Sequence, residues 1–136
     1  MQTSSSTHVR VGVDLVDVAR LTRFALEHST ELATVFTERE LTYCRLKRRC
    51  YEHMAARFAA KEAVLKAFGT GMGQGMCWTD VEVVSEGTGR PRVLLHGYVA
   101  DYAQKRGLLE LDISLSHTTG MAIAQVITVW QKRREE

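Results

Sequence analysis

Two segments of the sequence carry charged side chains among the apolar residues that a core requires. Asp14 lies in a run of alternating valines, whereas Glu62 and Lys66 lie in a continuous helical pattern between Arg49 and Gly69. Because an unpaired buried charge is costly, such a group finds a counter-ion, binds a metal or changes its protonation. The simpler alternative is a surface pair between Glu62 and Lys66, which contributes only about 0.3–0.5 kcal/mol. Spacing alone leaves both possibilities open.

The helix that carries Glu62 is predicted to run from about Arg49 to Gly69, with no glycine or proline inside it. On a wheel of about 100° per residue, one apolar stripe points toward the core, formed by Tyr51, Met54, Phe58, Leu65 and Phe68. Lys61 falls inside this stripe, so it also needs a partner. The glycine-rich segment 69–75 that follows leaves backbone amides free to approach a phosphate, although it matches neither phosphate-loop fingerprint.

Asp14 is predicted to lie on a strand over residues 9–15. Apolar residues alternate with others there, which is the period of a strand with one buried face, and we expect the valines on that face. Asp14 then projects to the opposite side. Gly12 shares that side and is expected to leave space in which a ligand can approach the backbone.

The remaining patterns place further helices and hairpins around these two segments. Asp17 is expected to cap a short helix, and Thr37 with Glu40 forms a capping box for another. A hairpin over 81–95, a helix over 98–106 and a second hairpin over 111–129 follow. The last strand is apolar on both faces, which indicates a central strand that is covered on both sides. The order predicts an α+β fold, with a mainly antiparallel sheet packed against a long central helix and shorter helices.

The composition is that of an ordinary globular chain of 136 residues with a formal charge of +2. We expect one domain over 9–130, a loose lead-in over 1–8 and a charged tail over 131–136. Four of the five residues 45–49 are basic, which indicates either a solvated face or a site for an acidic partner. Three cysteines without paired spacing, no signal peptide and no long apolar run favour a reducing cytoplasm and no membrane span.

Taken together, the motifs resemble the short, stand-alone 4'-phosphopantetheinyl transferases called holo-acyl-carrier-protein synthases. The resemblance covers Val11 to Ile127 and rests on several segments in family-like order. These are Gly12-Val13-Asp14-Leu15-Val16 with Arg20, Phe36-Thr37 with Glu40, Arg57 to Ala63 with Lys66-Ala67, Gly69-Thr70-Gly71, Gly89-Arg90-Pro91 and Ser114 to Thr118.

The resemblance implies that the 4'-phosphopantetheine arm of coenzyme A is transferred to a serine of an apo acyl carrier protein, releasing adenosine 3',5'-bisphosphate. It also implies Mg²⁺, held by Asp14 and Glu62, which suits an ion usually bound by one or two carboxylates plus phosphate oxygens. Lys66 would neutralise phosphate charge. Glu62, directly or through a metal-bound water, is the first candidate for the general base, and a water activated by Asp14 is the second.

The resemblance further implies binding and docking residues. Coenzyme A would contact Arg57, Lys66, Gly69, Gly71, Ser116 and His117. Arg20 and Arg49 would dock the acidic carrier, although Glu27 stands where some relatives have an arginine, which leaves the carrier preference open. A homotrimer with sites at subunit interfaces and a role in fatty acid, or polyketide, biosynthesis are also implied. Two alternatives compete: a module that binds coenzyme A or a carrier without chemistry, and a small basic nucleic-acid binder suggested by residues 45–49.

Overall fold

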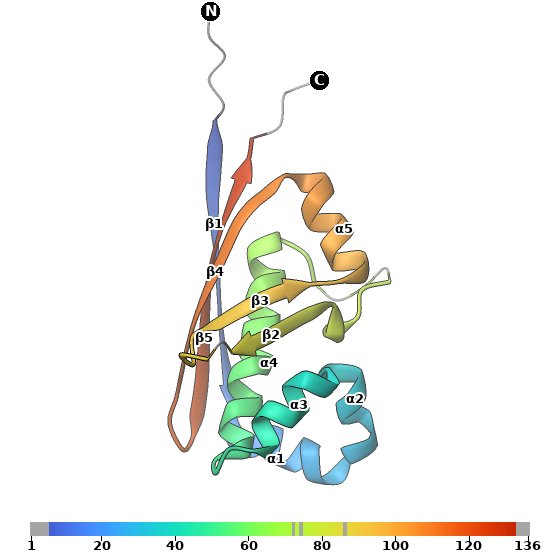
Figure 1. The fold of residues 1–136 in the computed structure, drawn as a ribbon, viewed down its shortest axis with the longest axis vertical. Helices are drawn as coiled ribbons and strands as arrows, with labels where there is room; N and C mark the ends of the chain where they lie inside the picture. Colours follow the sequence, from blue (N-terminus) through green and yellow to red (C-terminus); the bar gives the residue numbers. More distant parts are fainter. Residues whose placement is uncertain (1–5, 72, 74, 86, 133–136) are drawn as a thin grey trace, which may run out of the picture.

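A computed structural model gives the fold of residues 6–71, 73, 75–85 and 87–132 (Figure 1). The elements in chain order are β1 (Thr7–Asp17), α1 (Val18–Glu27), η1 (Ser29–Glu31), α2 (Leu32–Val35), α3 (Glu38–Arg45), α4 (Cys50–Phe68), η2 (Trp78–Asp80), β2 (Val81–Ser85), β3 (Pro91–Leu95), α5 (Gly97–Arg106), β4 (Leu108–His117) and β5 (Met121–Gln131). This is the predicted α+β fold. Most of the predicted lead-in and tail, at 1–5 and 133–136, lies outside the described residues. None of the described helices is long and apolar enough to cross a lipid bilayer.

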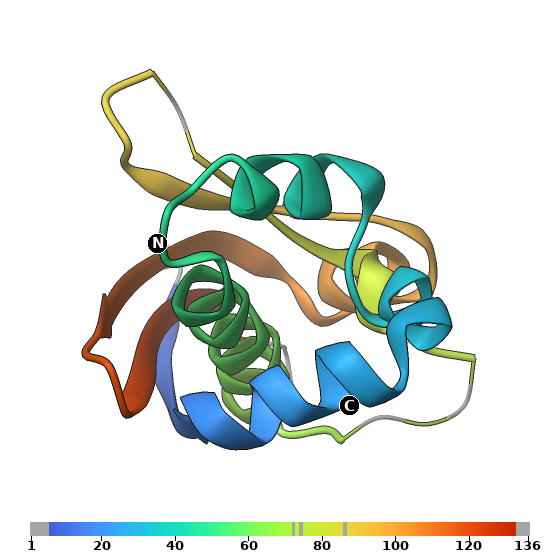
Figure 2. The ribbon, with the colours of Figure 1, turned by 90° about the horizontal axis from the view of Figure 1, so that it is seen from below.

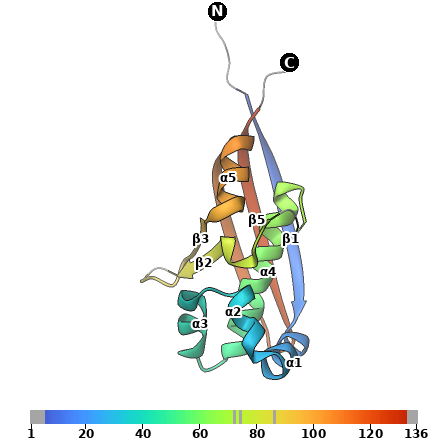
Figure 3. The same cartoon turned by 90° about the vertical axis from the view of Figure 1, so that its right-hand side faces the viewer.

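The strands form two antiparallel sheets. The larger sheet has the order β1-β5-β4, so β5 is central, as predicted. The prediction that both faces of β5 are covered is wrong, because Met121, Ile123 and Ile127 are exposed on one face. The β2–β3 hairpin forms the second sheet. The large sheet runs along the length of the molecule, with α1, α2 and α3 near one end and α5 near the other, where β1 begins and β5 ends (Figures 1 and 3).

Helix α4 is the centre around which these elements pack. Its six alanines, at positions 55, 56, 59, 60, 63 and 67, are all at most 1% exposed. Small side chains allow the backbones of β1 and β5 to approach the helix closely, and Val64 and Leu65 fill the space between them. The helix is therefore buried over far more of its circumference than the single apolar stripe predicted. It ends where expected, because Gly69 adopts the left-handed conformation with φ 77°.

Strand β1 faces the helix with the opposite side from the one predicted. Gly12 is buried against α4, and a β-carbon at that position would lie only 2.0 Å from the carbonyl oxygen of Ala63. The expected open space beside Gly12 is therefore filled by the helix backbone. The valines, in contrast, point away from the helix and are more than half exposed. Alternation gave the correct period of the strand but the wrong buried face.

The outer face of the large sheet is consequently apolar, and the residues that the structure describes leave it exposed. The β1 residues Val9, Val11, Val13 and Leu15 are 52–64% exposed, and the β5 residues Met121, Ile123 and Ile127 are 38–47% exposed. Val11 pairs with Ile127 and Leu15 pairs with Ile123 across the two strands, so the exposed side chains form one continuous patch. A patch of this kind usually marks an interaction surface.

Candidate active site

The close packing of β1 on α4 brings Asp14 to Lys66, 52 positions away in the sequence. The Lys66 ammonium lies 2.9 Å from Asp14 Oδ1 and also donates to the Val13 carbonyl at 3.1 Å. Lys66 therefore pairs with Asp14 and not with Glu62, the partner in the simpler of the two alternatives that spacing left open. The hydrogen bond and the charge of Asp14 raise the pKa of the Lys66 ammonium.

Glu62 lies beside the same pair, one turn of α4 before Lys66. Burial raises the pKa of the Glu62 carboxyl, the negative charge of Asp14 raises it further, and Lys66 opposes both effects. Two carboxylates that repel each other at one point favour a cation between them, or a proton on one of them. The structure thus brings together all three residues that were predicted to carry chemistry.

Asp14 and Glu62 line a cavity of about 490 Å³, which we call the carboxylate cavity. Its lining also includes Arg20, Phe24, Phe58 and Trp78. The rings of Phe58 and Trp78 are 5.0 Å apart, and they form an aromatic wall that the sequence did not indicate. Arg20 lies on α1 at the N-terminal end of that helix, so a predicted docking residue stands at the cavity that holds the carboxylates.

The donor set fits magnesium when phosphate completes it. Among the residues that the structure describes, His, Cys, Asp and Glu side chains do not gather in a group of three or more that could hold a metal alone. Mg²⁺ does not require such a group, because it is usually bound by one or two carboxylates together with substrate phosphates and water. Asp14 and Glu62 supply those two carboxylates at a cavity wide enough for a substrate.

Arg57 and His117 line a different cavity, also of about 490 Å³, which we call the cationic cavity. Its lining includes Tyr43, His53, Ser85 and Arg90, and it shares no residue with the carboxylate cavity.

Arg57 precedes Glu62 by five residues, which places the two side chains about 140° apart around the helix axis. Figure 2 shows α1 on one side of α4, and α3 with the β2–β3 hairpin on the other. The chain does not bring these two groups of predicted residues into one cavity.

Arg57 is buried, with 3% of its surface exposed, yet it is only partly paired. It donates from Nη2 to Ser85 Oγ at 2.7 Å and stacks over the Tyr43 ring at 4.1 Å. Its Nε finds no hydrogen-bond partner in the described part of the chain. A buried, unsatisfied guanidinium donor at a cavity favours an anionic ligand there.

The other predicted binding residues are spread more widely. Gly69 lines a third cavity at the C-terminal end of α4, beside Phe68 and Trp130, and Gly71 is exposed beyond it.

Ser116 is exposed on β4 and lines neither the carboxylate cavity nor the cationic cavity, whereas Ser114 lines the cationic one. Arg49 is exposed at the start of α4 and lies 3.5 Å from Glu52. These four positions do not converge on the carboxylates within one chain.

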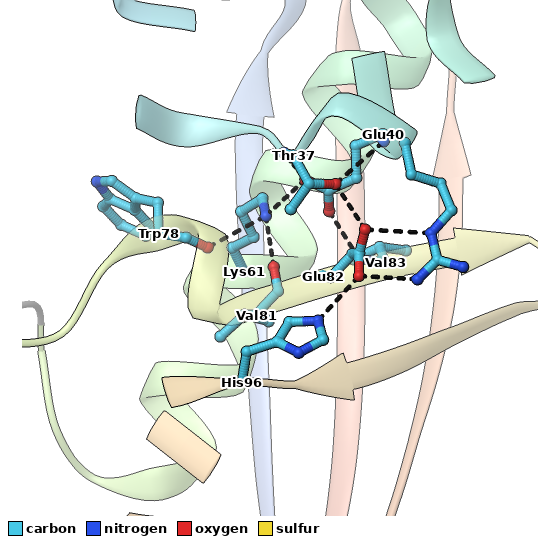
Figure 4. Close-up of polar contacts among 9 residues, drawn as sticks. Thr37, Glu40, Lys61, Trp78, Val81, Glu82, Val83 and His96 are labelled. Carbon is cyan, nitrogen blue, oxygen red and sulfur yellow. Dashed lines mark hydrogen bonds and ion pairs between the residues drawn. The ribbon is translucent and has the colours of Figure 1, made fainter. Parts of the chain in front are cut away.

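The helix turn that presents Glu62 is fixed by a buried ion pair (Figure 4). The Lys61 ammonium lies 2.9 Å from Glu40 Oε1, and both side chains have no exposed surface. The ammonium also donates to the carbonyl oxygens of Trp78 and Val81, so its three N–H groups all have partners. Glu40 is therefore the partner that Lys61 needs, because Lys61 falls inside the apolar stripe of the helix. The same contacts hold Trp78 at the wall of the carboxylate cavity.

Glu40 also accepts hydrogen bonds from two backbone amides. It accepts from the Thr37 amide at 2.8 Å, which completes the predicted capping box, and from the Val83 amide at 2.7 Å. Next to it, Glu82 contacts Arg39 at 3.0 Å and His96 at 2.9 Å (Figure 4). The hydrogen bonds from Arg39, Thr37 and His96 outweigh the effect of burial and hold the pKa of the Glu82 carboxyl at about 2. One polar network therefore joins α3, α4 and β2.

Comparisons with known proteins show the family to which the chain is related. Residues 10–125 match the family model of the 4'-phosphopantetheinyl transferase superfamily. A holo-[acyl-carrier-protein] synthase of Geotalea daltonii is 45% identical over 117 residues, covering 85% of this chain and 94% of that relative. One of Moorella thermoacetica is 43% identical over 116 residues, covering 85% and 90%. The solved Chronobacterium ammoniagenes ACPS-CoA complex matches with a TM-score of 0.82 at 29% identity, over 92% of this chain and 99% of that chain.

Separate removal of the two charges of the Lys61 and Glu40 pair tests its role. Lys61→Met leaves a buried carboxylate unpaired, so we expect a loss of about 3–5 kcal/mol in the free energy of unfolding. Adding Glu40→Gln removes that charge, and the double variant is expected to be more stable than Lys61→Met alone. Denaturant unfolding of wild type, both single variants and the double variant measures the coupling. Additive effects would show that the two charges do not depend on each other.

Proposed function

The chain belongs to the 4'-phosphopantetheinyl transferase superfamily, and we propose that it is a holo-[acyl-carrier-protein] synthase. It transfers the 4'-phosphopantetheine group of coenzyme A to a serine hydroxyl of an apo acyl carrier protein. The observation that carries this proposal is the meeting of Asp14, Glu62 and Lys66 beside one cavity, from segments far apart in the sequence. By the same family relationship, the product serves fatty acid, or polyketide, biosynthesis. Three free cysteines suit an enzyme of the reducing cytoplasm.

The reaction forms one bond and breaks another at the same phosphorus. The serine oxygen attacks the phosphorus that carries pantetheine, and the bond from that phosphorus to the bridging oxygen of the pyrophosphate breaks. The bridging oxygen leaves with adenosine 3',5'-bisphosphate. Positioning and electrostatic stabilisation supply most of the catalysis in such phosphoryl transfers.

The residues of this chain take distinct parts in that step. Glu62 accepts the serine proton, because its carboxylate faces the carboxylate cavity and is partly shielded from water. Lys66 neutralises phosphate oxygens, since its side chain is more than half exposed beside Asp14 and can turn toward a substrate. Asp14 and Glu62 would hold Mg²⁺, which when bound offsets negative charge on the pyrophosphate. Arg20 at the cavity rim receives acidic side chains of the carrier.

We further propose that the working enzyme is a homotrimer in which each site uses two copies of the chain. The support is twofold: the carboxylate and cationic cavities lie on opposite sides of α4, and the outer face of the large sheet is apolar and exposed. Contact between copies through that face would bring the carboxylates of one copy toward Arg57 and His117 of another. The number three follows the family resemblance.

Sedimentation of the purified protein tests the assembly. Three copies are expected, and Val11→Glu is expected to reduce their number because it places a charge in the centre of the apolar patch. Leu46→Glu is the matched control, since Leu46 is 81% exposed and lies outside the patch. A monomer with full activity would contradict the proposal.

The intact mass of a purified apo carrier, after incubation with the protein, coenzyme A and Mg²⁺, tests the reaction. We expect a gain of one phosphopantetheine group that disappears with a chelator. Glu62→Gln is expected to lower the rate by about a hundredfold or more, because it removes the proposed base and a proposed ligand together. Glu38→Gln, on the exposed side of α3, is the control. Tight coenzyme binding with no mass change on any carrier would instead favour the binding module.

A further inference from the structure

Glu52 is a buried carboxylate to which the reaction described above gives no part. It lies in the first turn of α4 and is 9% exposed. Its Oε1 lies 2.9 Å from Nδ1 of His117 on β4, and its Oε2 lies 3.5 Å from Arg49. The second contact is long and its arginine is 59% exposed, so solvent weakens it. His117 is therefore the main partner of Glu52.

A carboxylate at Nδ1 determines how a histidine presents its other nitrogen. Nδ1–H donates to the Glu52 carboxylate, so Nε2 is the nitrogen left for a ligand. In the imidazolium form both ring nitrogens carry a proton, and Nε2–H can then donate to a phosphate oxygen. His53 packs edge-on against the His117 ring at 4.9 Å and limits its rotation from a second side. Burial lowers the pKa of His53, and the positive charges of His117, Arg57 and Lys47 lower it further. His53 therefore adds packing to the His117 ring, while Glu52 supplies the negative charge.

The cavity that His117 lines has the donors of a phosphate site. Arg57 contributes a buried Nε with no partner among the described residues, and Ser85 contributes a hydroxyl. Arg90 also lines this cavity, where it pairs with Asp112 at 3.0 Å on the exposed side. Coenzyme A carries two anionic groups, the pyrophosphate and a 3'-phosphate monoester. The family resemblance implies that Asp14, Glu62 and Lys66 take the pyrophosphate and that Arg57 and His117 lie near the nucleotide and its 3'-phosphate, so we assign the monoester to the cationic cavity.

We propose that Glu52 is a positioning residue for this nucleotide, a role that rests on the proposed function. It holds His117 with Nε2 available to the 3'-phosphate, so that the enzyme prefers ligands that carry this group. Glu52 itself does not touch the substrate. Its removal should therefore affect recognition of one phosphate and leave the chemical step unchanged.

Equilibrium binding separates this role from a structural one without using the reaction. Calorimetry is run with adenosine 3',5'-bisphosphate and with adenosine 5'-monophosphate, on the assembled protein. Glu52→Gln is expected to weaken binding of the bisphosphate by about tenfold, the effect of one charge-assisted hydrogen bond, and to leave the monophosphate unchanged. Glu52→Asp, which keeps the charge, is expected to restore part of the affinity. Glu31→Gln is the control, because Glu31 also faces a histidine, His28 at 4.0 Å, but on the exposed surface.

A second variant keeps the test decisive if Glu52→Gln is less stable. In a His117→Ala background, Glu52→Gln is expected to have no further effect on bisphosphate affinity, since the group it positions is gone. With an active carrier, the KM for coenzyme A should rise in Glu52→Gln at constant kcat, while the KM for 3'-dephospho-coenzyme A stays the same. Equal weakening of both nucleotides, or an undiminished effect without His117, would overturn the proposal. Failure of the wild type to modify a carrier would overturn the function and leave the nucleotide result to stand separately.

Discussion

The buried pair of Lys61 and Glu40 is the interaction on which the rest of the structure depends. Lys61 uses its three N–H groups on Glu40 and on carbonyl groups of η2 and β2, and Glu40 accepts from Lys61 and from backbone amides at the N-cap of α3 and in β2. A buried charge is tolerated only under such conditions. Because Lys61 immediately precedes Glu62, the contacts that neutralise one residue also fix the helix turn that presents the other. The architecture and the chemistry thus share one segment of α4.

A second constraint is the absence of a side chain at Gly12. Only glycine allows β1 to lie so close to the α4 backbone that Asp14 reaches Lys66. The same packing turns the valines of β1 outward and creates the apolar face of the sheet. The close packing of β1 on α4 at Gly12 therefore accounts both for the carboxylate cavity and for the apolar surface through which we propose that copies of the chain associate.

Features determined by neighbouring residues were predictable from the sequence. The Asp17 cap, the capping box at Thr37 and Glu40, and the helix end at Gly69 each depend on side-chain or backbone hydrogen bonds over two to four positions. The buried face of β1 was not predictable in this way, because alternation fixes a period and not the side on which a helix lies. The partner of Lys66 was missed because it lies 52 residues away.

The sequence indicated which residues belong to the candidate site, but it did not indicate that they line two separate cavities. The motifs named Asp14, Glu62 and Lys66, which the structure places side by side, and also Arg57 and His117, which line another cavity. That the two groups occupy separate cavities depends on how α1, α3 and the hairpin wrap around α4, which no local pattern records. Glu52 gave no signal at all, since its role depends on contact with a strand 65 residues away.

We propose that one coenzyme site combines the carboxylate cavity of one copy with the cationic cavity of another. Mixing two inactive variants tests this arrangement. Glu62→Gln chains and chains carrying both Arg57→Gln and His117→Ala are each expected to be inactive. After subunit exchange in equal amounts, confirmed by native mass spectrometry, about a quarter of the wild-type rate is expected, because about one interface in four joins two intact halves. Mixed oligomers that are no more active than the separate variants would contradict the claim.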